Sequence, residues 1–236
     1  MTTEIPVKAR VPMPQPSRRF RLFQRRTVYL PTLTGWGLIV AVLLAPFVYW
    51  FFRGEKLLSL TDRKQADILV VEGWMHELAL FAAAREFETG GYKFIIATGE
   101  YTAEAGSPYR WSYSDIAEKT LRRAGVPADK IIRVPAEYVN NRRTFTTASI
   151  VRRYLEEQLH KKEATLNVFA FGAHARRSRL VYKKALGDHF TVGVVSWRPA
   201  EDFLTPWWKS SERAKDLLVE TFGWFFELLF NSGRVG

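Results

Sequence analysis

The sequence predicts an α/β protein, and two patterns along the chain support this fold class. From residue 66 onward, five short apolar runs alternate with segments whose apolar residues recur at helical spacing. Before them, residues 33–52 form an apolar stretch with no ionisable side chain. Strands that alternate with helices form right-handed βαβ units and a parallel sheet covered on both faces. We therefore expect a Rossmann-like, doubly wound, mainly parallel five-stranded sheet, preceded by one transmembrane helix.

The apolar stretch at residues 33–52 is long enough to cross a bilayer. At 1.5 Å per residue, a helix of this length spans about 30 Å, which is the thickness of the hydrocarbon core. Trp36, Tyr49 and Trp50 lie near its two ends, where amphipathic rings favour the lipid–water boundary. The stretch is longer than the apolar region of a signal peptide and ends in bulky side chains. An uncleaved anchor is therefore expected.

Basic residues flank this anchor unequally. Seven Lys and Arg residues precede it against Glu4, whereas four follow it, namely Arg53, Lys56, Arg63 and Lys64. The positive-inside rule then places the N-terminus in the cytoplasm and the domain outside it, in a single-pass membrane protein. Of the net charge of +11, the first 33 residues supply +6. Because membrane topology explains this excess, we expect no nucleic-acid partner.

The chain divides into four expected regions: a basic, proline-containing cytoplasmic arm at 1–32, the transmembrane helix at 33–52, a linker at 53–65 and the α/β domain at 66–232. The expected strands are 66–71, 93–98, 131–134, 166–171 and 190–196. The expected helices are 76–89, a helix capped by Ser112 or Ser114 and ending near 124, and then 144–160, 174–186 and 210–230.

Ligands of such sheets bind in the crevice beyond the carboxyl ends of the strands. This rule selects four loops, at residues 72–74, 98–100, 140–144 and 172–177. The last loop runs from a strand into a helix, so unpaired backbone N–H groups and the positive end of the helix dipole face the crevice. His174 and Arg177 are three residues apart and share one helical face. They are the strongest candidates for an anion site, with Arg177 as a bidentate clamp for phosphate or carboxylate.

The other three loops complete the candidate site. Arg143 and Thr144 open another helix at the same edge, where the arginine would add a cation and the hydroxyl either a helix cap or a phosphate contact. Glu72 and Glu100 end adjacent strands and would orient ligand hydroxyls, bind a divalent ion or, with His174, act in acid–base catalysis. The remaining expected ligand-binding residues lie beside these carboxylates: Gly73, Trp74 and Gly99. The sequence identifies no cofactor and no metal motif.

Aromatic residues are concentrated near the C-terminus, at 207–208 and 222–230. Two interpretations remain open for this segment. It forms a helix that covers the sheet, or part of its surface rests on the membrane interface, which the nearby anchor would permit.

The order of several motifs resembles that of the SanA/YdcF/ElyC-like bacterial envelope proteins over roughly residues 66–230. The motifs are VVEGW at 70–74, ATGE at 97–100, LRRAGVPADKI at 121–131, RRTFTTA at 142–148, FGAHARRSRLVYKKALGD at 171–188 and WWKSSE at 207–212. The resemblance implies an N-terminal anchor, a Rossmann-like domain facing the periplasm, and a role in envelope integrity involving peptidoglycan or lipid-linked polysaccharide precursors. One branch of the family is linked to S-adenosylmethionine binding.

Two loops depart from the family pattern. The loop after the first strand is glycine-rich in the family, whereas this chain has Glu72, Gly73 and Trp74 there. The usual NTxEN loop is replaced by residues 143–147, RTFTT, so its Glu and second Asn are missing. These departures suggest a branch with its own ligand preference.

Together with the resemblance, these observations predict a membrane-anchored protein of envelope biogenesis, located in the bacterial cytoplasmic (inner) membrane. Its extracytoplasmic domain would bind or process an anionic, phosphate-bearing precursor of the cell wall or a polysaccharide, for instance a polyprenyl-linked one. The alternative is a non-catalytic scaffold or regulator that docks on an envelope biosynthesis complex. The sequence does not decide whether the protein is an enzyme.

Overall fold

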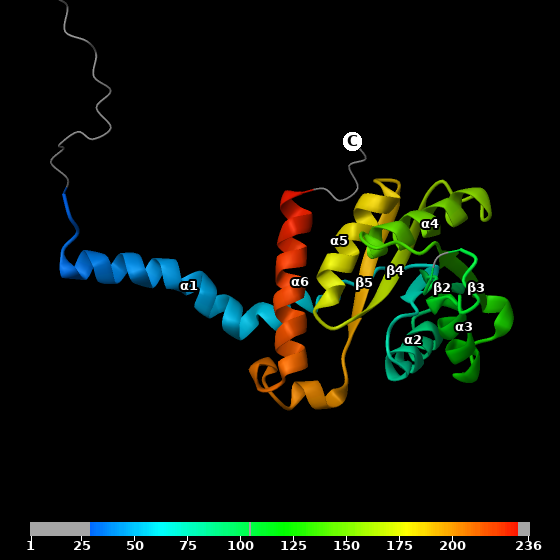
Figure 1. The fold of residues 1–236 in the computed structure, drawn as a ribbon, viewed down its shortest axis with the longest axis horizontal. Helices are drawn as coiled ribbons and strands as arrows, with labels where there is room; N and C mark the ends of the chain where they lie inside the picture. The colour runs from blue at the N-terminus through cyan, green and yellow to red at the C-terminus, as the bar shows by residue number, and fades with distance from the viewer. Residues whose placement is uncertain (1–28, 104, 231–236) are drawn as a thin grey trace, which may run out of the picture. The chain divides into compact units, whose positions relative to one another are not determined.

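A computed structural model describes residues 29–103 and 105–230 of the chain. The chain forms two compact units, residues 1–44 and 45–236. Helix α1 (Leu33–Leu58) is long and apolar enough to cross a membrane, as the sequence predicts. The second unit is the α/β domain together with the last turns of α1 (Figure 1). Most of the basic arm expected at 1–32 lies outside the described residues.

Five parallel strands form the sheet, which confirms the predicted fold class. They are β1 (Ile68–Glu72), β2 (Phe94–Glu100), β3 (Ile131–Ala136), β4 (Ala164–Phe171) and β5 (Phe190–Trp197). Their order across the sheet is β3-β2-β1-β4-β5. The central strand β1 is buried at all five positions, as is usual for a parallel strand with helices on both faces.

Helices cover both faces of this sheet. On one face, α2 (Glu77–Thr89) and α3 (Tyr113–Arg123) close an apolar core with the strands. On the other face, α4 (Arg143–Glu157) and α5 (His174–Leu186) close a second core. The last helix, α6 (Ser211–Leu229), packs on α5 rather than on the sheet. Short 3₁₀ turns complete the fold at Ala128–Lys130, Ala200–Phe203 and Trp207–Lys209.

The strand order places a crevice at the centre of the sheet. From β1 the chain proceeds outward to β2 and β3, and then returns across the sheet to β4 on the other side of β1. The connections after β1 and β4 therefore leave in opposite directions, which opens a crevice between their carboxyl ends. Glu72 ends β1, and His174 follows β4 after two residues. These two candidate residues thus lie at the topological switch point.

Residues 53–65, expected as a linker, contribute to the fold. Helix α1 continues to Leu58, whose side chain is buried. Asp62 then pairs with Val194 of β5 through backbone hydrogen bonds. Asn167, buried in β4, accepts a hydrogen bond from Lys64 N at 2.9 Å and donates one to Lys64 O at 2.8 Å. A buried asparagine of the inner strand β4 thereby attaches this segment to the sheet.

Replacing this asparagine tests the attachment. We expect Asn167→Ala to lower the free energy of unfolding by about 3 kcal/mol, because the backbone groups of Lys64 and the hydroxyl of Tyr92, 3.0 Å from Asn167 Nδ2, lose their partner. Denaturant titration of the full chain in detergent micelles measures this loss. Thr165→Ala, a partly exposed position on the same strand, is the matched control. Equal effects of the two variants would contradict the prediction.

Candidate functional site

A cavity of about 1090 Å³ opens beyond the carboxyl ends of the strands. Its walls come from the ends of β1 and β2, the first turns of α4 and α5, and one side of α6. Seven of the nine residues predicted for the site line it: Glu72, Trp74, Glu100, Arg143, Thr144, His174 and Arg177. The strand-end rule therefore brings residues from four separate loops to one cavity.

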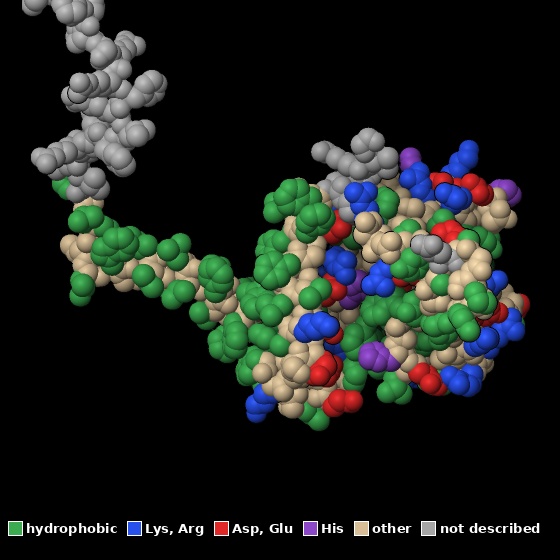
Figure 2. Space-filling view, in the orientation of Figure 1, with side chains coloured by type: hydrophobic (Ala, Val, Ile, Leu, Met, Phe, Trp, Pro, Cys, Tyr) green, Lys and Arg blue, Asp and Glu red, His purple; other side chains and the backbone are tan. Residues whose placement is uncertain are grey.

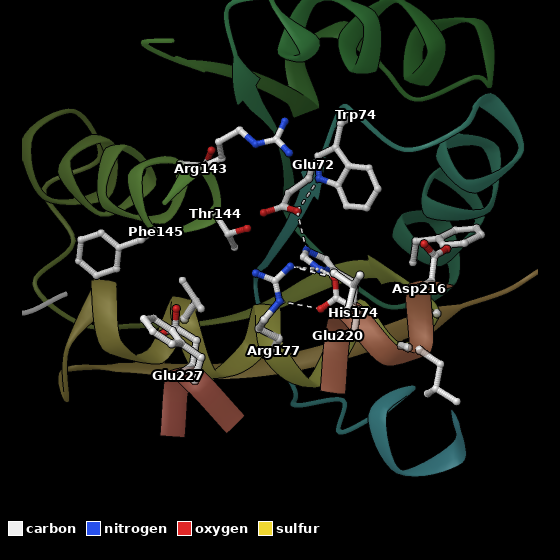
Figure 3. A pocket seen from close by; sticks show the side chains of 18 of the residues that line it. Glu72, Trp74, Arg143, Thr144, Phe145, His174, Arg177, Asp216, Glu220 and Glu227 are labelled. Carbon is white, nitrogen blue, oxygen red and sulfur yellow. Dashed lines mark hydrogen bonds and ion pairs between the residues drawn. The ribbon is translucent and has the colours of Figure 1, made fainter. Parts of the chain in front are cut away.

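A cluster of four charged side chains forms the floor of this cavity (Figure 3). His174 Nδ1 lies 3.0 Å from Oε1 of Glu220 on α6. Arg177 binds the same carboxylate side-on through one edge of its guanidinium, with Nε 2.6 Å from Oε2 and Nη2 2.9 Å from Oε1. On the other side, His174 Nε2 lies 3.6 Å from Oε2 of Glu72. The imidazole is thus held between two carboxylates.

Burial and charge together set the protonation states in this cluster. Burial opposes a charge on His174, but the carboxylates of Glu220 and Glu72 outweigh it and raise the pKa of the imidazole from 6.5 to about 9. Burial likewise opposes the charge of Glu220, but Arg177 and His174 lower the pKa of its carboxyl to about 2. At neutral pH the cluster therefore contains an imidazolium beside two carboxylates and a guanidinium.

Glu72 stays ionised although its side chain is almost fully buried. Burial raises the pKa of its carboxyl, but His174 and the hydrogen bond from Trp74 more than offset this and lower it. Trp74 Nε1 donates to Oε2 at 2.8 Å, and the Tyr182 hydroxyl donates to Oε1 at 3.3 Å. The carboxylate is therefore held in a fixed orientation by an indole, a phenol and the imidazolium.

The second carboxylate of the predicted pair, that of Glu100, ends the neighbouring strand β2. Glu100 accepts a hydrogen bond from Arg143 Nη1 at 3.2 Å through Oε1. Its Oε2 is buried and has no hydrogen-bond partner among the described residues. The side chain of Arg143 itself is 67% exposed, so this guanidinium has further donors to offer at the cavity mouth.

Two helices begin at the cavity without a side-chain cap. Neither Arg142 nor Ala173, the N-cap residues of α4 and α5, makes a capping hydrogen bond through its side chain in the described structure. By contrast, Ser112 caps α3 and Ser210 caps α6 through their hydroxyls. The N-terminal N–H groups of α4 and α5 thus add two positive partial charges to the cavity wall.

The lining as a whole is not electropositive. Seven carboxylates line it against five arginines and the protonated His174. Many of these groups pair with each other: Glu55, for example, binds Arg198 at 3.0 Å and Arg213 at 2.6 Å. The bidentate clamp expected of Arg177 likewise holds a carboxylate of the protein, that of Glu220. Positive potential is therefore concentrated at the starts of α4 and α5, beside Arg143.

Gly73 and Gly99 lie next to the cavity, but neither is among the described residues that line it. A Cβ at residue 73 would lie 1.9 Å from the carbonyl oxygen of Tyr113, and one at residue 99 would lie 2.6 Å from Tyr113 Cβ. The close backbone approach that the sequence suggests at these glycines is therefore made by the first turn of α3. Both glycines serve the packing of α3 against the ends of β1 and β2.

Sequence reasoning missed Glu220, which is central to the cluster. It lies 46 residues beyond His174, and nothing local links the two. A signal was present, however, because Glu220 and Glu227 are the two carboxylates in the apolar segment 217–230 and lie seven residues apart, on one helical face. Gly223, between them, was missed as well. A Cβ there would lie 2.9 Å from Arg177 Cδ, so this glycine leaves room for the arginine.

Within the part of the chain that the structure describes, no group of three or more His, Asp or Glu side chains is placed to hold a metal ion. The described site offers several charged groups of its own. It combines an imidazolium, two ordered carboxylates and the starts of two helices, which suits anion binding and proton transfer.

The raised pKa of His174 predicts a pH-dependent stability. A group whose pKa rises from 6.5 to about 9 on folding stabilises the fold fully below about pH 6.5, and this contribution disappears as the pH rises through about 9. We expect His174→Gln to cost roughly 3 kcal/mol near pH 6 and markedly less at pH 10. Thermal unfolding in micelles at both pH values measures the difference, with exposed His189→Gln as control. A cost for His174→Gln that is the same at both pH values would contradict the assigned charge state.

Comparisons with known proteins identify no relative of this chain. No protein-family model matches the chain, and neither a curated protein nor a solved structure matches it.

Proposed function

We propose that this protein binds, and transfers a proton to, a phosphate-bearing envelope precursor at the cavity beyond the sheet. One observation carries the proposal: the first turns of α4 and α5, both without a side-chain cap, border the same cavity as a histidine that is protonated at neutral pH. Helix N-termini attract anions, and an imidazolium is an acid. The same cavity thus provides a place for a phosphate and a proton donor beside it.

In this proposal the α4 side binds the anion. Arg143 and Thr144 occupy the first turn of α4 and line the cavity. Glu100, which contacts Arg143 through only one oxygen, competes with the ligand for this guanidinium. Arg177 has a different part: because Glu220 engages its Nε–Nη2 edge in a bidentate contact, it positions the carboxylate that holds His174.

His174 and Glu72 carry the proton chemistry of the proposal. Nδ1 of His174 faces Glu220, whereas Nε2 makes no hydrogen bond among the described residues and lies 3.6 Å from Glu72. The proton on Nε2 is thus the one available to a ligand that enters between the two side chains. Once His174 has given it up, Glu72 and Glu220 favour its return, since both stabilise the imidazolium.

The cellular setting belongs to the same proposal. An apolar helix that could span a membrane precedes the domain, and seven basic residues precede its apolar stretch at 33–52 against four that follow this stretch. Together with the resemblance of residues 66–230 to SanA/YdcF/ElyC-like proteins, this supports a domain outside the cytoplasm of a bacterium, anchored in the inner membrane. A precursor presented on a lipid carrier would then reach the cavity from the bilayer surface.

A second candidate is a non-catalytic scaffold or regulator of an envelope biosynthesis complex. The mutual neutralisation of Glu72, His174, Glu220 and Arg177 favours it. A closed ion cluster that joins α5, β1 and α6 has a purely structural use, namely to hold α6 in place. Ligand binding at Arg143 discriminates between the two candidates.

We expect Arg143→Ala to weaken binding of a short-chain polyprenyl phosphate roughly 10- to 100-fold, the effect of losing a hydrogen bond between charged groups. Titration calorimetry of the full chain in lipid nanodiscs measures the affinity. Arg153→Ala, an exposed arginine on the same helix that does not line the cavity, is the control. Unchanged affinity in Arg143→Ala would refute the proposed anion site, and no measurable binding by the natural chain would favour the scaffold.

The membrane topology of the chain is tested separately. Because the chain contains no cysteine, a single introduced thiol is the only site that a maleimide can label. In Glu157→Cys the new thiol lies at the exposed C-terminal end of α4. We expect a membrane-impermeant maleimide to label it in intact spheroplasts, to the same extent as after lysis. Labelling that requires lysis would place the domain in the cytoplasm and contradict the proposed location.

A further inference from the structure

Helix α6 presents an apolar surface to its surroundings along its second half. Its exposed side chains between residues 218 and 230 are all apolar: Leu218, Val219, Phe222, Phe225, Phe226, Leu228, Leu229 and Phe230. The first turns are different, since Glu212, Lys215 and Asp216 are exposed there. In Figure 2 this change is visible as a group of hydrophobic side chains over the C-terminal half of α6.

The two carboxylates of this half point the other way, into the protein. Glu220 binds Arg177 and His174, and Glu227 is bound by Lys184 at 3.1 Å. A surface helix in water buries its apolar face and exposes its charges. Here charges are paired inside and aromatic rings are outside, which is the arrangement of helices in contact with lipid.

The same half of α6 is packed against the end of the candidate span. Trp50, within the apolar stretch 33–52, donates a hydrogen bond to Thr221 Oγ1 at 3.2 Å. It also belongs to an apolar cluster with Leu217 and Trp224 of α6 and with Trp207. Phe51, the next residue of α1, stacks on Trp208 with ring centroids 4.8 Å apart. The aromatic end of the span and α6 are therefore one packed body.

We propose that the apolar surface of α6 inserts into the interfacial layer of the same bilayer that α1 spans. Trp50 lies at the end of the span, where tryptophan favours the lipid–water boundary. Since Thr221 contacts Trp50 directly, α6 lies at this depth whenever α1 is in the membrane. The partner is thus the lipid itself, and α6 is a second, in-plane membrane contact that adds to the anchor. The inference rests on the membrane anchor and does not depend on the proposed ligand of the cavity.

Single cysteines introduced into the cysteine-free chain test this contact. Phe222→Cys and Leu229→Cys, at side chains 73% and 75% exposed and seven residues apart, are labelled with an environment-sensitive fluorophore. The protein is reconstituted in vesicles of phosphatidylcholine and phosphatidylglycerol that contain a lipid with a nitroxide near its headgroup. Leu78→Cys, an apolar position on α2 that is 65% exposed, is the matched control. Because all three sites are exposed, the substitutions leave the core intact.

We expect the nitroxide lipid to quench the probes at 222 and 229 several-fold more strongly than the probe at 78. Quenching at 222 and 229 no stronger than at 78 would overturn the inference. A second copy of the chain is the main rival occupant of this surface. It would protect both probes from the nitroxide and give excimer emission when pyrene is attached at 222, at a high ratio of lipid to protein. That result would also overturn the inference.

Discussion

The ion cluster around His174 is the interaction on which the cavity at the carboxyl ends of the strands and the position of α6 depend. Charges that are taken out of water must be paired, because an unpaired buried charge costs several kcal/mol. His174 and Arg177 both lie on the first turns of α5, and Glu72 alone would leave this pair of cations with one carboxylate. Glu220 supplies the second from α6. The cluster therefore requires α6 to lie against α5, and α6 in turn forms one wall of the cavity.

This constraint also explains the unusual surface of α6. With Glu220 and Glu227 committed to partners on α5, one face of the helix is polar and buried. The apolar residues that remain have to face outward or toward the end of α1. Trp50 and Trp224 meet in one apolar cluster there. The charge pairs of the site and the apolar surface of the helix are thus two consequences of the same arrangement.

Much of the fold follows from local pattern, whereas the site follows from it only in part. The five strands are found where continuous apolar runs predict them, and their boundaries differ by at most two residues. The strand-end rule brings Glu72, Glu100, Arg143 and His174 to one cavity because it depends only on topology. This rule does not select Glu220, because Glu220 lies on a helix that follows the last strand and not in a loop at a strand end. Its position depends on tertiary packing, which no local pattern encodes.

The partner of Arg177 changes what the site is able to do. A free guanidinium beside a helix N-terminus is well placed to bind an anion, but here its Nε–Nη2 edge holds Glu220. The arginine thus keeps that carboxylate ionised, and the carboxylate keeps His174 protonated, with a pKa of about 9. Arg143, whose side chain is 67% exposed, is the more open cation for a ligand. In the proposed function, anion recognition falls mainly to Arg143 and proton donation to His174, so a ligand would contact both side chains.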